Sequence, residues 1–229
     1  MSGASHRPRL SLVIPVLDEA ATLAASLASL QAWRGQAEII LVDGGSEDQS
    51  RAIAEPLVDK VLRSAPGRAT QMNAGAAAAQ GEYLLFLHCD TRLSIAPAEL
   101  YTLLDQSPGW GFFSVSLSGN DWRLRLIEFG MNWRSRLTAI ATGDQCLFLS
   151  RECWEHEGGF AAIPLMEDVE LCKRLRRHCR PFRIAVPVVT SSRRWEQYGI
   201  LKTVFTMWTL RWRYWLGADP AELARAYYR

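Results

Sequence analysis

Three acidic sites adjoin apolar stretches of the sequence, at positions where carboxylates could do chemistry. Asp90 closely follows the apolar run 84–87, Asp43 ends the run that starts at residue 38, and Glu167-Asp168 begins a segment with helical spacing. Open α/β sheets bind ligands at the carboxyl ends of their strands, although an aspartate placed there also forms turns. Carboxylate oxygens bind divalent cations and accept protons. Three such sites together predict one ligand pocket.

The elements that would position these residues alternate along the first ninety residues. Strand-like apolar runs occur at 10–16, 38–42, 57–62 and 83–87, and helix-period stretches separate them at 19–33, 46–55 and 69–80. This alternation predicts βαβ units and a mostly parallel sheet. In the first helical stretch, Leu23, Leu27 and Leu30 share one face, which we expect to pack on the sheet.

The pattern changes after residue 108. Polar and apolar residues alternate over 110–117, which predicts a half-exposed antiparallel strand. A further strand is predicted at 146–149, and Val169, Cys172 and Leu175 form a helical apolar stripe behind Glu167-Asp168. The sheet is therefore expected to be mixed.

The composition is that of an ordinary globular protein. The chain has 229 residues, of which 48% are hydrophobic and 22% charged, and its net charge of +2 gives no general basic field for nucleic acid. Five cysteines without a C-x-x-C pair favour reduced thiols. The polar start of the chain lacks the apolar core of a secretion signal, so we expect a cytoplasmic protein that does not bind nucleic acid.

Four short motifs, taken in order, resemble those of family 2 glycosyltransferases with the GT-A fold. The motifs are Ile14-Pro15-Val16-Leu17-Asp18-Glu19, Val42-Asp43-Gly44-Gly45-Ser46-Glu47-Asp48, His88-Cys89-Asp90 and Glu167-Asp168. The resemblance covers roughly residues 9–195. Within it, the run 67–75 is most similar to a small bacterial subgroup described as associated with radical-SAM or selenoprotein domains.

The resemblance implies a fold and a division of the chain. It implies an α/β protein with a mixed, mostly parallel sheet flanked by helices and followed by a helical extension. We expect a flexible amino terminus over 1–9, a GT-A domain over 10–195 and the carboxyl-terminal helical extension over 196–229.

The resemblance also implies a reaction. A sugar would pass, with inversion at its anomeric carbon, from a nucleoside-diphosphate sugar to the hydroxyl of an unknown acceptor. Asp168 would act as general base, in preference to Asp144, and Asp90 would hold a Mg²⁺ or Mn²⁺ ion that stabilises the diphosphate leaving group. The usual motif has an aspartate where this chain has His88, whose imidazole could contact a ribose or phosphate, bind a softer metal, or simply fill the loop.

Further residues are expected to line the substrate site by the same resemblance. Asp43 would contact the nucleoside, Arg68 the diphosphate, and Gly143-Asp144-Gln145 the acceptor side. The full set of expected substrate-binding residues is Pro15, Asp18, Glu19, Asp43, Arg68, Asn73, His88, Gly143, Asp144, Gln145, Glu167, Arg194 and Trp195.

Ordinary structural roles compete with several of these assignments. Asp43 suits an Asx turn, Asp18 or Glu19 suits the cap of the first helix, and Arg68 suits a solvated helix start. Glu167-Asp168 could complement a helix dipole, and the segment 143–145 could be a tight turn.

Residues 199–216 are expected to form one aromatic helix. Its apolar stripe favours packing on the catalytic core or in a homodimer over peripheral contact with a membrane. Lys202, Arg211 and Arg213 argue against a span, because charges inside hydrocarbon are costly.

Two other functions compete with sugar transfer. His88 and Gly44 leave open a catalytically weak or inactive GT-A domain that binds a nucleotide or a partner protein. A nucleotidyltransferase would use a similar sheet and metal site, but the chain lacks a glycine-rich, lysine-bearing phosphate loop after its first strand.

Overall fold

A computed structural model describes residues 7–228. The predicted flexible segment 1–9 lies mostly outside this range. Where the description begins, the carbonyl oxygens of Pro8 and Arg9 accept hydrogen bonds from the backbone N–H groups of Glu82 and Tyr83.

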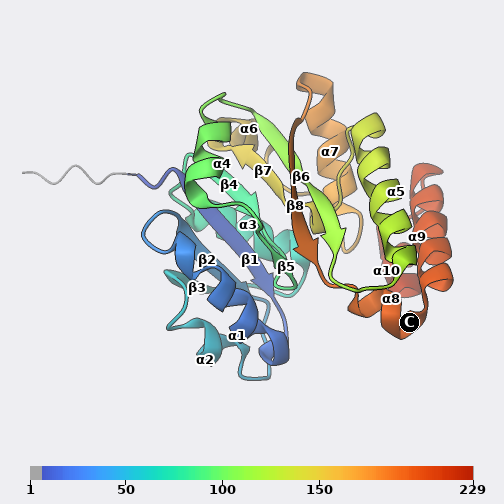
Figure 1. Cartoon of the computed structure of the whole chain (residues 1–229), viewed down its shortest axis with the longest axis horizontal. Helices are drawn as coiled ribbons and strands as arrows, with labels where there is room; N and C mark the ends of the chain where they lie inside the picture. Colours follow the sequence, from blue (N-terminus) through green and yellow to red (C-terminus); the bar gives the residue numbers. More distant parts are fainter. Residues whose placement is uncertain (1–6, 229) are drawn as a thin grey trace, which may run out of the picture.

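Within residues 7–228, eight strands form one mixed sheet (Figure 1). Their order across the sheet is β3-β2-β1-β4-β7-β6-β8-β5. The bounds are β1 Leu10–Val16, β2 Glu38–Asp43, β3 Lys60–Arg63, β4 Tyr83–Phe86, β5 Thr91–Arg92, β6 Trp110–Leu117, β7 Leu147–Ser150 and β8 Phe182–Thr190. The first four strands are parallel, whereas β7 runs antiparallel to both β4 and β6. The prediction of a mixed sheet is confirmed.

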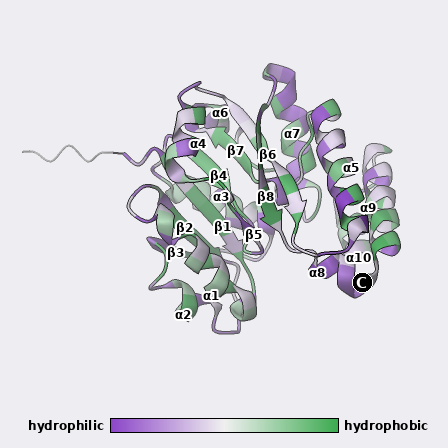
Figure 2. Cartoon of the chain, in the orientation of Figure 1, coloured by the Kyte–Doolittle hydropathy of each residue, from purple (hydrophilic) through white to green (hydrophobic). Residues whose placement is uncertain are grey.

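Helices cover both faces of the sheet. On one face lie α1 (Ala20–Ser29), α2 (Ser50–Ala54) and α4 (Pro97–Leu104), with Leu23, Leu27 and Leu30 buried against the strands as predicted. On the other face lie α3 (Arg68–Ala78), α6 (Arg151–Glu157) and α7 (Glu167–His178). Because side chains alternate across a strand, Leu12 and Ile14 enter the first core and Val13 the second. Figure 2 shows the resulting apolar strands between more polar helices.

One strand differs from its prediction. In β6 only Ser114 and Ser116 are partly exposed, and the other six residues are buried, so it is not half-exposed. The reason is its place between β7 and β8, with the aromatic residues of both faces covered. It pairs antiparallel with β7, as expected, and parallel with β8.

The remaining helices lie beyond the β8 side of the sheet (Figure 1). They are α5 (Trp122–Thr138), α8 (Arg193–Tyr198), α9 (Ile200–Trp215) and α10 (Pro220–Tyr227). Leu210 of α9 and Leu223 of α10 pack with Met166 and Val169 at the start of α7. The helix predicted over 199–216 is confirmed as α9. Among residues 7–228, none of the helices combines the length and the apolar character needed to cross a bilayer.

The predicted packing of the aromatic stripe of α9 on the core is wrong. Phe205 and Trp208 are each 74% exposed, and Trp212 and Trp215 also face outward. Thr203 and Leu210 are the buried residues of this helix instead. The stripe therefore lies on the surface of the described chain.

Candidate active site

The polar segments that follow β1, β2 and β4 lie along one edge of the sheet. β1 lies between β2 and β4. The strands that follow β1 in sequence are therefore added first on one side of it, as β2 and β3, and then on the other side, as β4. Such a switch point opens the crevice at the strand ends where α/β sheets bind ligands. The Gln71 side chain closes the gap between β1 and β2, because its Nε2 donates to the carbonyl oxygens of Val16 at 2.8 Å and Val42 at 2.9 Å.

Asp43 is buried at the end of β2. Its Oδ1 accepts a hydrogen bond of 2.9 Å from the backbone N–H of Ser46, which is three residues on and thus one residue further than in the predicted Asx turn. Its Oδ2 lies 3.9 Å from Nε of Arg63. Oδ1 thus stabilises the turn after β2, and Oδ2 faces the guanidinium of Arg63. Since Oδ2 takes no part in the turn, it can also accept a hydrogen bond from a ligand.

Neither Asp18 nor Glu19 caps α1 with its side chain. The predicted role of these residues as a helix cap is therefore wrong, and their predicted role in substrate binding stays a prediction. Asp18 has φ 53°, and its Oδ1 accepts from the backbone N–H of Glu47 at 2.8 Å. The N–H groups at the start of the helix are bound from the β2–α2 loop instead, by Ser50 Oγ at Glu19 and by Asp48 Oδ2 at Ala20. The two loops at the crevice therefore hold each other in place.

His88, Gly143 and Asp168 converge from three distant parts of the chain. The backbone N–H of Gly143 donates to Oδ2 of Asp168 at 2.8 Å. The ring of His88 lies so close to Gly143 that an added Cβ would sit 2.3 Å from its Cε1. Nδ1 of His88 is 4.0 Å from Oδ1 of Asp144. A small hollow beside them is lined by Met72, Phe86, His88, Gly143, Leu147, Phe160, Glu167 and Asp168.

The acidic side chains in this cluster repel one another. Although the side chain of Asp144 is 47% exposed, the protein packed around it and the carboxylates of Asp90 and Asp168 raise its pKa above the ordinary value, against the opposing effect of His88 and Arg68. Burial and the Asp168 carboxylate raise the pKa of Glu167 in the same way, although Arg68 opposes this. The carboxylates of Asp90, Asp144, Glu167 and Asp168 act on one another here, and a bound cation would offset their charge.

Four buried polar atoms in the described chain have no hydrogen-bond partner, and all belong to this region. They are Nε of Arg68, Nε of Arg134, Oγ1 of Thr142 and Oε2 of Glu167. Arg68 lies against Glu167, with Nε 3.2 Å from Oε1. Burial lowers the pKa of Arg134, while Asp168 and Asp144 oppose that shift, so its guanidinium lies among the same carboxylates. Buried groups without partners are rare, and a cluster of them indicates a ligand site.

The end of the chain reaches the same region. The guanidinium carbon of Arg194 lies 3.7 Å from the ring centre of Tyr227, and its Nη2 donates to the Tyr227 carbonyl oxygen at 3.3 Å. Burial raises the pKa of Tyr227, and Arg194, Arg68 and Asp144 are among the charges that act on it. Arg193 directly precedes Arg194 at the start of α8, and its Nη2 is 3.9 Å from Glu19 Oε2. Trp195, on the same helix, is half-buried.

Three of the predicted substrate-binding residues are buried or hydrogen-bonded to other parts of the protein. Asn73 donates to and accepts from the backbone of Phe160, at 2.9 Å in both directions. Gln145 is buried, and its Nε2 donates to Ser135 Oγ at 2.9 Å and to the Phe113 carbonyl oxygen at 3.3 Å. Pro15 is buried within β1. These contacts give all three residues a role in holding the walls of the crevice.

Three residues of this region were not predicted from the sequence, namely Arg134, Thr142 and Tyr227. Thr142 directly precedes the predicted Gly143, so its position was a usable signal. Arg134 lies inside a long helix among other arginines, and Tyr227 lies far beyond the motifs, so neither has a local pattern that distinguishes it. Their place in the site depends on how α5 and α10 pack.

A larger hollow of about 400 Å³ lies at the other end of β4. It is lined in part by Gln80, Gly81 and Arg151. The guanidinium of Arg151 is already bound to the carbonyl oxygens of Gly81 and Ala79, at 2.9 and 2.8 Å. This hollow therefore lacks the unpartnered groups that mark the crevice at the carboxyl ends.

Comparison with known proteins agrees with this geometry. The model of the family Glycosyl transferase family 2 matches residues 11–108, the part that runs from β1 to the end of α4. No curated protein sequence matches the chain. Among solved structures, the mannosyltransferase PcManGT from Pyrobaculum calidifontis, in complex with GDP-Man and Mn²⁺, superposes with a TM-score of 0.61 at 20% identity over 82% of this chain and 57% of that one.

This chain has the GT-A fold. TarS of S. aureus (residues 1–349, with UDP) matches with a TM-score of 0.65 at 14% identity, over 80% of this chain and 60% of that one. Glucosyl-3-phosphoglycerate synthase from Mycobacterium tuberculosis, in complex with Mn²⁺, UDP and glucosyl-3-phosphoglycerate, matches with a TM-score of 0.57 at 17% identity, over 78% and 70%. The GT-A chain described here spans less than two thirds of the length of the first two proteins. The predicted fold is confirmed.

Proposed function

We propose that this protein is an inverting glycosyltransferase that moves a sugar from a nucleoside-diphosphate donor to a hydroxyl of its acceptor. The observation that carries the proposal is the cluster of buried, unpartnered groups on Arg68, Arg134, Thr142 and Glu167 beside the carboxylates of Asp144 and Asp168. It lies at the switch point of a GT-A sheet. The family match over residues 11–108 supports the same reaction class.

The donor would bind along the strand ends. Asp43, with one oxygen in the turn, would contact the nucleoside, and Arg68 would face the diphosphate, for which a guanidinium is geometrically suited. PcManGT was solved with GDP-Man, and TarS with UDP and with UDP-GlcNAc, so GDP- and UDP-sugars are the first donors to test.

Asp90 and His88 are the residues that would hold a divalent cation. The carboxylates in the cluster fit such an ion, and a nitrogen donor beside an oxygen donor suits Mn²⁺ better than Mg²⁺, which prefers oxygen alone. When bound, the cation supplies stabilisation of the charge that develops on the leaving diphosphate. PcManGT and the glucosyl-3-phosphoglycerate synthase were both solved with Mn²⁺.

Asp168 is the proposed general base. The N–H of Gly143 binds its Oδ2, and the N–H of Val169 binds its Oδ1 at 2.6 Å, so the carboxylate is held in one orientation at the start of α7. It would take the proton of the acceptor hydroxyl as that oxygen attacks the anomeric carbon from the face opposite the diphosphate. Asp144, whose pKa is raised, is the competing base in the same cluster.

The test combines donor binding with turnover. The full chain is incubated with a panel of GDP- and UDP-sugars with and without Mn²⁺, and release of the nucleoside diphosphate is measured with water as the acceptor. Selective stabilisation by one donor, together with release that Asp168→Asn abolishes, supports the proposal. Donor binding by the parent protein without release of the nucleoside diphosphate would instead favour a nucleotide-binding domain.

We also propose that the chain falls in the small bacterial subgroup to which residues 67–75 are similar. This segment forms Gly67 and the first two turns of α3, including Arg68 and Asn73. The proposed division into a GT-A domain over 10–195 and a helical extension over 196–229 is supported by the position of α9 and α10 beyond β8.

A second proposal concerns the exposed faces of α5 and α9, which we assign to the inner surface of a membrane rather than to a homodimer. Aromatic and aliphatic side chains cover both helices, namely Trp122, Leu126, Phe129, Trp133 and Leu137 on α5, and Leu201, Phe205, Trp208, Trp212 and Trp215 on α9. Figure 1 draws both helices on the same side of the molecule, beyond β6 and β8. Leu124 of α5 lies by α8, and Ile140 after α5 packs in the same cluster as Leu210 of α9.

Charge favours the membrane as the occupant. Apart from Arg134, which lies among the carboxylates of the active site, α5 carries three arginines and one glutamate, and α9 carries three basic residues and no acidic one. Exposed aromatic residues among basic residues are typical of interfacial helices on anionic lipid. Two copies of this face would instead place like charges against one another.

A further inference from the structure

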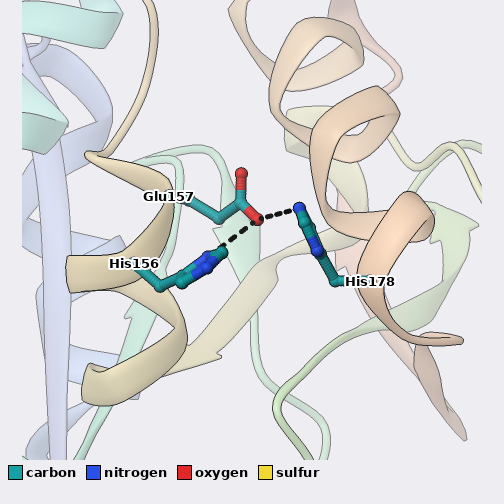
Figure 3. Close-up of side chains that lie close together, drawn as sticks. All are labelled: His156, Glu157 and His178. Atoms are coloured by element: carbon teal, nitrogen blue, oxygen red, sulfur yellow. Dashed lines mark ion pairs between the residues drawn. The ribbon is translucent and has the colours of Figure 1, made fainter.

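A second cluster of metal-binding side chains lies away from the active site. His156 and Glu157 end α6, and His178 ends α7 (Figure 3). One ligand atom from each of the three residues lies within 4.8 Å of the others. Asp168 stands at the opposite end of α7, ten residues away, which corresponds to about 15 Å along a helix. The cluster is therefore separate from the proposed donor site.

We propose that His156, Glu157 and His178 form a Zn²⁺ site that clamps the ends of α6 and α7. Oε1 of Glu157 is 3.5 Å from Nδ1 of His156 and 3.4 Å from Nε2 of His178. A tetrahedral zinc ion with bonds of about 2.0–2.1 Å places neighbouring ligand atoms about 3.3–3.4 Å apart. The carboxylate oxygen thus already lies near the spacing of a tetrahedral edge from each imidazole nitrogen, and the two nitrogens lie within 4.8 Å of each other.

The surroundings hold the carboxylate in the orientation that the metal requires. Arg174 Nη1 lies 3.3 Å from Oε2 of Glu157, so Oε1 is the oxygen that faces the imidazoles. Arg174 also binds Glu170 at 2.8 Å and the Gly159 carbonyl oxygen at 2.6 Å. Glu170 offsets the charge of Arg174, so the pair of glutamates leaves net negative charge beside the site. Such outer contacts orient metal ligands in known sites.

The types of the three ligands and their exposure favour zinc with one coordination position open to solvent. Glu157 is 5% exposed, whereas the side chains of His156 and His178 are 66% and 57% exposed, so the site opens to solvent on the imidazole side. Two imidazoles and one carboxylate suit zinc better than Mg²⁺ or Ca²⁺, which prefer oxygen alone. Water would complete the fourth position. Because both helices end here, bound zinc stabilises the fold.

The experiment is a thermal-shift titration of the full chain with ZnCl₂. At about a hundredfold excess over the dissociation constant, we expect the Tm to rise by roughly 5–10 °C. Asp90→Ala should keep this rise, since it removes the proposed ligand at the other site. The double variant His156→Ala/His178→Ala should lose it. Both histidines are exposed, so the double variant should unfold within about 2 °C of the parent without metal.

Two further measurements test whether the metal binds to His156, Glu157 and His178 and not to another group. Co²⁺ should give the visible absorption of a four-coordinate ion in the parent protein and in Cys179→Ser, which removes the exposed thiol next to His178. Loss of that absorption in Glu157→Gln supports the proposal. A Tm shift that persists in the double histidine variant, or no shift in the parent protein, overturns it. None of these readouts depends on glycosyl transfer.

Discussion

The backbone N–H of Gly143 binds Oδ2 of Asp168 at 2.8 Å, which joins the loop before β7 to the start of α7 across 25 residues of sequence. The same glycine leaves room for the ring of His88, which follows β4. One hydrogen bond and one close contact thus fix the relative positions of the proposed base, the acceptor-side loop and the residue beside the proposed metal ligand.

Asp168→Asn should remove turnover and keep donor affinity. The amide of the variant keeps one acceptor oxygen for the Gly143 N–H, whereas its NH2 group cannot accept the Val169 N–H, so one of the two hydrogen bonds of this side chain is kept while the base is lost. We expect kcat for nucleoside diphosphate release to fall by about a hundred- to ten-thousandfold and the donor Kd to change by less than about twofold. Asp144→Asn is the matched control in the same cluster. A larger loss of kcat in Asp144→Asn than in Asp168→Asn would transfer the role of base to Asp144.

Gly143→Ala should displace His88. The new methyl group would lie 2.3 Å from Cε1 of His88, well below any normal contact. We expect a loss of about 1–3 kcal/mol in the free energy of unfolding, together with weaker donor binding in the presence of Mn²⁺. The control is Gly130→Ala on exposed α5, where nothing lies within 4 Å of an added Cβ. That variant should gain about 0.5–1 kcal/mol.

A double variant separates the clash from other effects of Gly143. Replacing His88 by alanine removes the ring, so His88→Ala/Gly143→Ala should be destabilised no more than His88→Ala alone. Strictly additive losses of stability in the two single variants would show that His88 is not what Gly143 accommodates.

Asp43→Asn and Asp90→Ala should weaken donor binding in different ways. Asp43→Asn keeps an oxygen for the Ser46 N–H, so its stability should stay close to that of the parent while nucleoside affinity falls. Asp90→Ala should instead reduce the dependence of affinity on Mn²⁺. Calorimetry with a nucleoside diphosphate, with and without Mn²⁺, measures both effects. Unchanged affinity and unchanged metal dependence in both variants would exclude the proposed donor site.

Stability should depend on pH through Asp144. Because the folded protein raises the pKa of this carboxyl above its ordinary value of 3.8, the folded state binds its proton more tightly than the unfolded state. Ionising Asp144 therefore costs stability as pH rises from about 3.8 through the folded pKa, and the cost then stays constant. Asp144→Asn should match the parent at the acidic end and exceed it at neutral pH. Denaturant unfolding from pH 4 to 8 measures the difference, which should shrink when donor and Mn²⁺ are added.

The faces of α5 and α9 should bind vesicles that contain anionic lipid. Trp208→Ser/Trp212→Ser removes two exposed aromatic residues and should reduce co-sedimentation several-fold, with no loss of stability. Leu17→Ser, at another exposed apolar position, is the control. Salt should weaken the binding. The parent protein could instead fail to bind vesicles and sediment as a dimer, with the tryptophan variant sedimenting as a monomer. That result would show that the face is a self-association surface.

The sequence by itself determined the amino-terminal half of the fold and the positions of its polar strand ends. Apolar runs of strand length alternating with helical stretches allow few arrangements other than βαβ units, and β1, β2 and β4 lie close to their predicted positions. The β3 strand begins three residues later than expected, at Lys60. The start of α7 at Glu167 was also predicted, because Val169, Cys172 and Leu175 mark its buried face.

Only the tertiary structure decided which groups meet in the crevice and which face solvent. Arg134 and Tyr227 reach the carboxylates through the packing of α5 and α10, and local spacing carries no information about such long-range contacts. The aromatic stripe of α9 has the period of a buried helix, yet Trp208 and Trp212 lie outside, because the core contact is made through Leu210. Periodicity identifies the apolar face of a helix, whereas its partner is set by the position of that helix in the fold.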